Sequence, residues 1–406
     1  MRTTRTAPLA PRRIVLALGL LTALGPLTVD LYVPALPELG RDFDATASAV
    51  QASLSGSTIG LAIGTLLVGP WSDRAGRRLP LLVSTALHIA ASLLCALAPS
   101  IEMLIATRVL GGAAAAGGGV VAAAMVRDMY RGLPMMRLTA QLALISGAAP
   151  IIAPLLGSLL MVWFDWRGIF WWLAAYAVLA LAIAAIVVPE TLRRDERPVG
   201  WRSTLLAVRS VMGDRQFRLL MMMGAALWSG QFAFIAGSPF LFQDRLGFTN
   251  SQFALVYAVC ATGFVAGAQL APRLAVRIGP ERVLRYGCCV MAVAALASTA
   301  AIAGGVVPLL IVTLCVGVAA VGTSIPAARA LAMNRIDRHA GTAAALLGAS
   351  NFAVAGIATP LAGLAIGPIG LSMAVVIFAS AAVAAFLSTR LAVADADSWN
   401  GSAEPA

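Results

Sequence analysis

Lysine is absent from this chain of 406 residues, so all 29 of its basic residues are arginine. Without lysine the chain has no P-loop of the Gly-Lys-Ser/Thr type and no amine for a Schiff base with pyridoxal or retinal. Histidine is scarce too, because the sequence contains only His88 and His339. Two isolated histidines make neither a catalytic pair nor a metal cluster. We therefore expect no metal and no cofactor, and a polytopic membrane enzyme is a remote alternative.

Charged side chains are few, at 12% of residues, whereas apolar residues make up 60%. Soluble domains carry about 25% charged and 45–50% apolar residues. The sequence also contains apolar runs of about 20 residues, the length that crosses a hydrocarbon core of about 30 Å. We predict an all-α polytopic membrane protein with twelve transmembrane helices. The runs are 14–36, 47–68, 79–98, 101–126, 138–161, 169–188, 217–241, 253–272, 283–303, 306–328, 342–365 and 371–387.

The arginines are distributed unevenly between the two sides of the predicted membrane. With a cytoplasmic N-terminus, Arg41, Arg167 and Arg245 lie outside, Arg108 lies within a span, and the other 25 lie on the cytoplasmic side. This excess of arginine in cytoplasmic loops follows the positive-inside rule. We predict a multi-pass protein of the bacterial cytoplasmic (inner) membrane with both termini cytoplasmic. The net charge of +11 then indicates membrane lipid as the neighbour, not nucleic acid.

A polar segment divides the sequence into two halves of six spans each. Residues 190–218 contain seven arginines and four acids, and they separate the sixth run from the seventh. The predicted units are an N-terminal six-helix bundle over 1–189, a cytoplasmic linker over 190–216, a C-terminal six-helix bundle over 217–390 and a cytoplasmic tail over 391–406.

Short motifs recur about half a chain apart. Gly69-Pro70 corresponds to Ala271-Pro272, and Pro154-Leu155-Leu156-Gly157 corresponds to Pro360-Leu361-Ala362-Gly363. Such repetition indicates a duplicated six-helix unit, as in transporters built from parallel repeats. We expect the chain to be a monomer.

All five cysteines lie within the predicted spans, where disulfides have neither an oxidant nor obvious partners. We interpret them as packing residues. His88 is alone in the third span, and we interpret it as packing too, with a proton relay as the alternative. The cysteines are Cys95, Cys260, Cys288, Cys289 and Cys315.

Asp30 is the one acid of 18 that lies well inside a predicted span. A carboxylate in hydrocarbon costs about 2.5–3.5 kcal/mol on insertion scales, so it indicates a partner, a water-filled cavity or a function. Arg108 is the only cation inside a span, and counting residues places it within about a turn of the depth of Asp30. We expect the two side chains to face one cavity. Burial favours the neutral acid and a movable cation favours the carboxylate, which suits a proton site. A static ion pair is the alternative.

Two further features sit at the ends of spans. Pro34 and Pro37 are predicted to break the first helix near its outer end and to free backbone carbonyls, with an ordinary helix terminus as the alternative. Residues 69–78 form a compact charged turn between the second and third spans. Asp73 lies there beside several arginines, so charge-assisted contacts can latch the two bundles in one state. A topology signal is the alternative for this turn.

Aromatic side chains with a few polar neighbours suggest a large apolar pocket, as drug-sized sites are lined in this way. Lipid-facing or packing aromatics are the alternative for each of them. The tentative substrate-binding residues are Tyr32, Trp228, Gln231, Phe232, Phe234, Tyr257, Asn351 and Phe352.

Several motifs together resemble those of one family across nearly the whole chain. These are the Asp-x-Tyr-x-Pro-x-x-Pro ending of the first span, the turn at 69–78, and the later runs Val126-Arg127-Asp128-Met129-Tyr130, Ala149–Gly157, Pro189-Glu190-Thr191-Leu192 and Ala340-Gly341-Thr342-Ala343. The chain resembles the Bcr/CflA group of drug:proton antiporters in the major facilitator superfamily.

The resemblance implies roles for particular residues. Asp30 would be the proton-coupling acid and Arg108 the motif B arginine. Pro150, Pro154 and Gly157 would belong to the antiporter motif, in which Ser158 replaces a second glycine. The gating motif would consist of Gly69, Asp73, Arg74, Gly76 and Arg77.

We therefore predict proton-coupled secondary efflux of small amphipathic drugs by alternating access between two bundles. An ion gradient suits a chain with one buried acid and no nucleotide motif. The alternatives are a proton-coupled importer of a small metabolite and, more remotely, the membrane enzyme.

The arginine asymmetry generates a test of orientation. Reporter domains fused at Arg202 and in the C-terminal tail should both be cytoplasmic, and one fused at Asp165 should be external. Accessibility of the reporters to a membrane-impermeant reagent in whole cells measures this. A cytoplasmic reporter at Asp165 would contradict the twelve-span arrangement.

Overall fold

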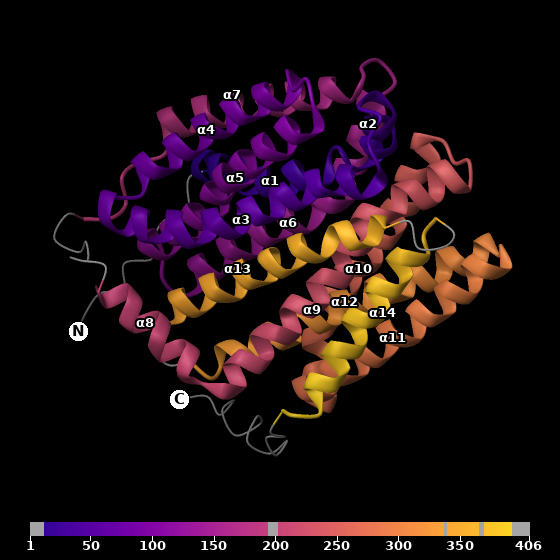
Figure 1. Ribbon diagram of the computed structural model, residues 1–406. Helices are drawn as coiled ribbons and strands as arrows, with labels where there is room; N and C mark the ends of the chain where they lie inside the picture. The colour runs from indigo at the N-terminus through magenta and orange to yellow at the C-terminus, as the bar shows by residue number, and fades with distance from the viewer. Residues whose placement is uncertain (1–11, 194–201, 337–338, 365–368, 392–406) are drawn as a thin grey trace.

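The computed structural model describes residues 12–193, 202–336, 339–364 and 369–391, which form an all-helical bundle (Figure 1). Twelve of its helical segments are long and apolar enough to cross a membrane, which confirms the predicted fold class. The predicted C-terminal tail beyond residue 391 and part of the predicted linker lie outside the described residues.

The first half of the chain supplies seven helices. They are α1 (Arg12–Asp30), α2 (Leu36–Asp42), α3 (Ala47–Ala75), α4 (Arg78–Ala96), α5 (Ile101–Met129), α6 (Gly132–Leu160) and α7 (Trp166–Val187). A short helix, α8 (Arg202–Gly213), precedes the second half. The second half contains α9 (Arg215–Pro239), α10 (Asn250–Ile278), α11 (Pro280–Gly304), α12 (Val307–Met333), α13 (Ala340–Ala358) and α14 (Leu371–Ser388).

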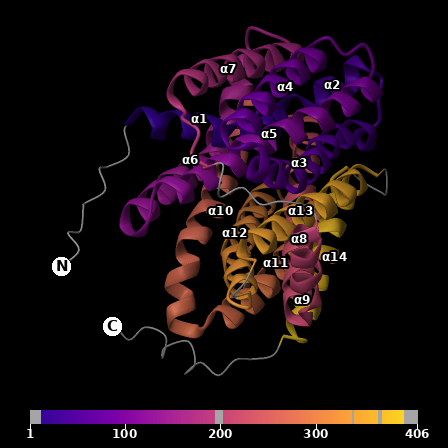
Figure 2. The ribbon, with the colours of Figure 1, turned by 90° about the vertical axis from the view of Figure 1, so that its left-hand side faces the viewer.

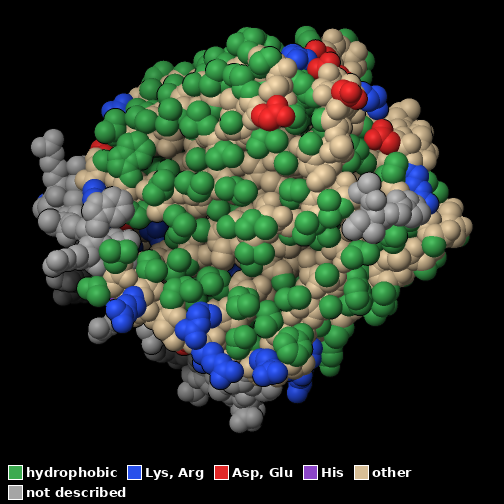
Figure 3. Space-filling view, viewed as in Figure 1, with side chains coloured by type: hydrophobic (Ala, Val, Ile, Leu, Met, Phe, Trp, Pro, Cys, Tyr) green, Lys and Arg blue, Asp and Glu red, His purple; other side chains and the backbone are tan. Residues whose placement is uncertain are grey.

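The two halves form two bundles that lie one above the other in Figures 1 and 2. We call the end of the molecule that carries α8 the linker end and the opposite end, which carries α2, the far end. On the face shown in Figure 3, apolar side chains cover the middle, acidic ones gather at the far end together with a few basic ones, and basic ones gather at the linker end. A membrane protein is expected to carry its charges at the two interfaces in this way.

The first membrane helix is interrupted directly after Asp30, as the prolines predicted. Helix α1 ends at Asp30, a 3₁₀ turn spans Val33–Ala35, and α2 begins at Leu36. Proline cannot donate a backbone hydrogen bond, so the carbonyls that precede it need other partners. Gln243 supplies one of them, because its Nε2 donates to the carbonyl of Pro34 over 3.0 Å.

The charged turn predicted over residues 69–78 is shorter than expected, and this part of the prediction is wrong. Helix α3 continues through Pro70 to Ala75, and α4 begins at Arg78. Proline is tolerated inside membrane helices because neighbouring groups satisfy the freed backbone. The reversal itself occurs at Gly76, whose φ of 92° is readily available only to glycine.

The second half repeats this turn. Helix α10 ends at Ile278, Gly279 follows with a φ of 85°, and Pro280 then begins α11. Helices α3 and α5 cross closely in the first half, as α10 and α12 do in the second. A Cβ atom on Gly112 would lie 2.1 Å from the oxygen of Ser57, and one on Gly322 would lie 2.2 Å from the oxygen of Phe264. The two halves therefore share both a turn and a mode of packing, as duplication of one unit predicts.

These close crossings generate a prediction about stability. Gly112→Ala should destabilise the protein by about 1–3 kcal/mol, because the new methyl group meets backbone that must move. Gly119→Ala is the matched control on the same helix, since its Cβ would have no neighbour within 4 Å. The control should be neutral or more stable by up to about 1 kcal/mol, from helix propensity. Thermal unfolding in detergent measures both, and equal midpoints would contradict the close crossing.

Candidate functional site

A cavity of about 250 Å³ lies between the two halves. Its wall comes from α1, α3 and α6 of the first half and from α9, α10, α12 and α13 of the second. We call it the central cavity. The lining is almost entirely apolar, and Asp30 and Tyr257 are its only titratable residues among those described. A volume of this size approaches that of sites for drug-sized ligands.

Most residues predicted for substrate binding line this cavity, and two do not. The lining includes Trp228, Gln231, Phe232, Phe234, Tyr257 and Phe352, together with Asp30 and Pro150. Tyr32 instead lies inside the first half, where its hydroxyl is 3.2 Å from Oγ of Ser53. Asn351 does not belong to the wall, and its Oδ1 would lie 3.0 Å from a Cβ on Gly224. We therefore remove Tyr32 and Asn351 from the candidate binding residues.

Asp30 makes a hydrogen bond across the interface between the halves. The hydroxyl of Tyr257, on α10, donates to Oδ1 of Asp30 over 3.1 Å. Both side chains are buried. The tyrosine ring is held by a stacked contact with Phe234 at 5.6 Å between ring centroids and by an edge contact with Phe253 at 5.9 Å. The carboxyl group of the first half is therefore tied to a rigidly placed donor of the second.

Arg108 does not share the cavity with Asp30, so that expectation does not hold in this structure. Its Nη2 donates over 2.7 Å to the carbonyl of Thr28, near the end of α1, and its guanidinium lies 4.0 Å from the ring centroid of Tyr32. No carboxylate of the described residues lies within ion-pair distance of it. A cation at a helix C-terminus is stabilised by the partial negative charge there. Arg108 thus stabilises the end of α1 from within the first half.

His88 is also buried within the first half, next to Thr28 of α1, the residue to which Arg108 donates. Its Nδ1 lies 3.1 Å from the carbonyl of Gly111, and its Nε2 lies 3.4 Å from the hydroxyl of Thr28. It is buried and absent from the cavity wall. This position agrees with its interpretation as a packing residue.

Aromatic rings form one side of the central cavity. Trp228 lies 5.8 Å from Phe232 and 5.7 Å from Phe352, measured between ring centroids. Oε1 of Gln231, from the same helix as Trp228, is buried without a hydrogen-bond partner. Buried polar atoms are normally paired, so this oxygen is available to a donor in the cavity. The arrangement can hold a flat apolar molecule that carries a hydrogen-bond donor.

The proposed antiporter motif places α6 against the broken part of α1. A Cβ on Gly157 would lie 1.9 Å from the backbone oxygen of Leu31, so glycine is required at this contact. Pro150 and Pro154 lie within α6, and Pro150 reaches the cavity. Ser158, where the family has glycine, is buried and lies 3.5 Å from Ser251 of α10. Its hydroxyl therefore faces the other half.

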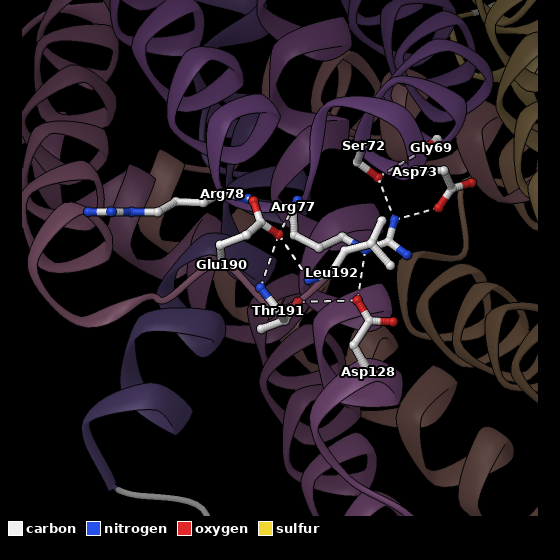
Figure 4. A network of polar contacts seen from close by, with 9 residues as sticks. All are labelled: Gly69, Ser72, Asp73, Arg77, Arg78, Asp128, Glu190, Thr191 and Leu192. Carbon is white, nitrogen blue, oxygen red and sulfur yellow. Dashed lines mark hydrogen bonds and ion pairs between the residues drawn. The ribbon is translucent and has the colours of Figure 1, made fainter. Parts of the chain in front are cut away.

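A polar network surrounds Arg77 at the linker end, and Figure 4 shows its members. The guanidinium donates to Oδ2 of Asp128 over 2.8 Å, to Ser72 over 2.9 Å and to Asp73. These contacts join the ends of α3 and α5 within the first half. Of the other gating residues, Gly69 accepts a hydrogen bond from Ser72, and Arg74 lies in the last turn of α3. The contact between bundles that the sequence suggested for Asp73 stays a prediction.

Glu190 extends this network to the segment after α7. Its Oε1 accepts from the backbone N–H groups of Arg77, Thr191 and Leu192 over 2.8, 3.0 and 3.0 Å. Partial burial acts to raise its pKa, but these backbone donors prevail, and the pKa of Glu190 lies below its usual value. Asp128 and Glu190 belong to sequence motifs, but only the folded chain shows that they bind Arg77.

The two halves also meet through polar contacts at the far end. Arg41 pairs with Asp244 over 3.3 Å, Ser48 donates to the carbonyl of Pro360 over 3.0 Å, and Gln51 donates to the carbonyl of Ala236 over 3.2 Å. No sequence signal identified Ser48 or Gln51, because their partners lie in the other half.

Comparison with known proteins agrees with this architecture. The family model described as Major Facilitator Superfamily matches residues 18–360. An "Uncharacterized MFS-type transporter YdgK" of Bacillus subtilis is 32% identical over 88% of this chain and 90% of its own length. A "Chloramphenicol resistance protein" of Pseudomonas aeruginosa is 32% identical over 82% and 79%, and a "Bicyclomycin resistance protein homolog" of Haemophilus influenzae is 28% identical over 84% and 87%.

Solved structures of the same fold are more distant in sequence. A D-xylose-proton symporter superimposes with a TM-score of 0.74 at 16% identity, over 93% of this chain and 97% of its own. The xylose transporter XylE of Escherichia coli, in a partially occluded inward open conformation, gives 0.73 at 14% identity over 94% and 98%. These likenesses show the fold.

The network around Glu190 generates a prediction with a pH dependence. Because the pKa of Glu190 is lowered on folding, its carboxylate stabilises the protein above the pKa of the unfolded chain. This contribution is lost as the pH falls through the folded value. Glu190→Gln should therefore lower stability at neutral pH by less than about 1 kcal/mol, since the group is largely exposed. Thermal unfolding from pH 7 to pH 3 measures the difference from wild type. A difference that persists unchanged at pH 3 would contradict the role of the charge.

Proposed function

The chain belongs to the Major Facilitator Superfamily and is a membrane transporter, and we propose that it exports small amphipathic drugs in exchange for protons. The relatives named for bicyclomycin and chloramphenicol resistance are consistent with the Bcr/CflA group that the motifs resemble. The proposal goes beyond the transporter fold in two respects, the proton coupling and the substrate.

The hydrogen bond between Asp30 and Tyr257 carries the proposal for coupling. Asp30 belongs to the first half and its donor to the second, so the bond lasts only while the halves are closed around it. A donor to a carboxylate favours the ionised form, and loss of the donor in an apolar cavity favours the neutral acid. In the proposed cycle Asp30 exchanges its proton as this bond breaks and forms again with the movement of the halves.

The direction of this cycle depends on which end is external. Arg41, Asp165 and Arg245 are near the far end, and the arginine-rich network of Arg77 is at the linker end. We place the linker end in the cytoplasm, following the positive-inside rule. Protons are then taken up from outside and released inside, which is the downhill direction in a respiring bacterium. Drug then moves in the opposite direction, provided that the halves change conformation only when the cavity holds either a proton or a drug molecule.

The central cavity fits an amphipathic substrate. Its wall offers aromatic rings, one unpaired amide oxygen on Gln231 and one acid. A small number of polar groups in an apolar site orients a ligand but does not restrict the ligand to one shape. Loose aromatic contacts accept different ring systems, as a drug exporter requires. The substrate proposed is a small molecule with an aromatic face and a hydrogen-bond donor.

The decisive experiment compares wild type with Asp30→Asn in inverted membrane vesicles, where export appears as uptake. Asparagine keeps the size and the hydrogen bonding of the side chain and abolishes titration. Uptake of chloramphenicol driven by an imposed pH gradient should be lost in Asp30→Asn, while binding of the drug to purified protein is retained. Undiminished gradient-driven uptake in the variant would overturn the assignment of Asp30.

The chain offers a matched control for that substitution. Asp44→Asn makes the same chemical change at an exposed residue outside the cavity, with a φ of 47° that asparagine also tolerates. Transport by this control should equal that of wild type. Uptake that accumulates drug in right-side-out vesicles, not inverted ones, would indicate an importer.

Tyr257→Phe tests the donor by itself. Phenylalanine keeps the stacking on Phe234 and removes only the hydroxyl, so the neutral form of Asp30 gains relative to the carboxylate. The pH of half-maximal transport should rise by up to about one unit, the equivalent of one hydrogen bond. An unchanged pH profile would show that the bond plays no part in coupling.

A further inference from the structure

Two cysteines from different helices meet inside the second half. The Sγ atoms of Cys260, on α10, and Cys315, on α12, lie 2.8 Å apart. Cys260 is fully buried, and Cys315 is partly exposed. The sequence predicts packing residues without obvious partners, and the fold gives these two cysteines each other as neighbours. The fold brings together two residues that are 55 positions apart.

The backbones of α10 and α12 also approach closely at this level. A Cβ on Gly263, one turn after Cys260, would lie 3.5 Å from the backbone oxygen of Cys315. One turn further, a Cβ on Gly267 would lie 2.4 Å from the oxygen of Ala319. A disulfide requires Cα atoms about 4.4–6.8 Å apart, a separation that only a close helix crossing allows. Two thiols in contact at such a crossing are placed to form a bond.

Cys260 and Cys315 are neighbours of residues that line the central cavity. Ala261, next to Cys260, and Val318, one turn after Cys315, both line the cavity. Tyr257, the donor to Asp30, lies one turn before Cys260 on the same helix. We propose that Cys260 and Cys315 form a peroxide-sensitive thiol pair that closes to a disulfide, joins α10 covalently to α12 and slows transport by shifting Tyr257 of α10 relative to Asp30. The effect on transport rests on the proposed function, whereas formation of the bond does not.

The oxidant that the reaction needs is hydrogen peroxide, which is small and uncharged. Cys315 is the more exposed residue of the two and reacts first: its S–O bond forms, the O–O bond breaks and water leaves, which produces a sulfenic acid. The sulfur of Cys260 then attacks that of Cys315, so the S–S bond forms, the S–O bond breaks and a second water leaves. Two thiols lose two electrons and two protons, and peroxide is reduced to two waters. Attack by an added thiol reverses the bond.

The bond can be detected directly in the full-length protein. Because the chain lacks lysine, trypsin cuts only after arginine and yields peptides 246–273 and 286–329. The second peptide also contains Cys288 and Cys289, so the experiment uses the Cys288→Ser/Cys289→Ser background. After treatment with hydrogen peroxide, mass spectrometry without reductant should show the two peptides joined, and dithiothreitol should separate them.

Cys95 provides an internal control for specificity. It lies in the first half, where its Sγ contacts the hydroxyl of Thr107 and not another thiol. Its peptide, 79–108, should remain unlinked and should react fully with a maleimide after unfolding. Absence of the linked pair 246–273 and 286–329, or equal linkage of either peptide to 79–108, would overturn the proposal.

Transport is then measured in the same background before and after oxidation. Gradient-driven drug uptake should fall several-fold with peroxide, recover with dithiothreitol and stay unchanged in the variant that also carries Cys260→Ser. If the two peptides are linked by peroxide but gradient-driven uptake, active before oxidation, does not change, the proposed effect on transport is overturned. A linked pair in a protein that moves no drug before oxidation would leave the thiol pair established and count against the proposed function instead.

Discussion

The break in the first membrane helix after Asp30 is the constraint on which the arrangement of the site depends. Backbone groups in a bilayer must be satisfied within the protein, and a helix that stops inside it leaves its last carbonyls unpaired. Two other elements donate to carbonyls of this broken segment: Arg108 of α5 donates to Thr28, and Gln243 of the second half donates to Pro34. Gly157 of α6 has no side chain and so allows the close approach of the Leu31 oxygen. Asp30 is held at the centre of these contacts, at the cavity wall.

This constraint also explains why Arg108 is buried without a carboxylate. A guanidinium in an apolar interior needs compensation, which an ion pair usually supplies. Here the end of α1 supplies part of it, through a full hydrogen bond and the partial charge of the helix terminus, and the face of the Tyr32 ring adds a further attraction. Asp30 is thereby left to interact with the opposite half. The separation of the two charges allows the acid to respond to movement between the halves.

The close crossings of α3 with α5 and of α10 with α12 provide the rigid parts that such movement requires. Glycine at each crossing lets backbone meet backbone, and packing of this kind holds membrane helices together where the hydrophobic effect between helices is absent. The polar contacts between the halves at the far end are different in kind, because they are single hydrogen bonds and one exposed ion pair. Bonds of that kind cost about 0.5–1.5 kcal/mol each to break. The halves can therefore separate while each bundle keeps its structure.

The sequence by itself determined the membrane class, the number of spans and the single buried acid, because hydrocarbon imposes length and polarity on every crossing segment. It also located the break at Pro34, since proline acts on its own chain. Only the tertiary structure decided what each side chain meets. Tyr257 as the donor to Asp30, Arg108 behind α1, and the contact of Cys260 with Cys315 all join residues far apart in the chain. Such contacts depend on how helices rotate and cross, and apolar periodicity does not encode this in helices that are buried on several sides.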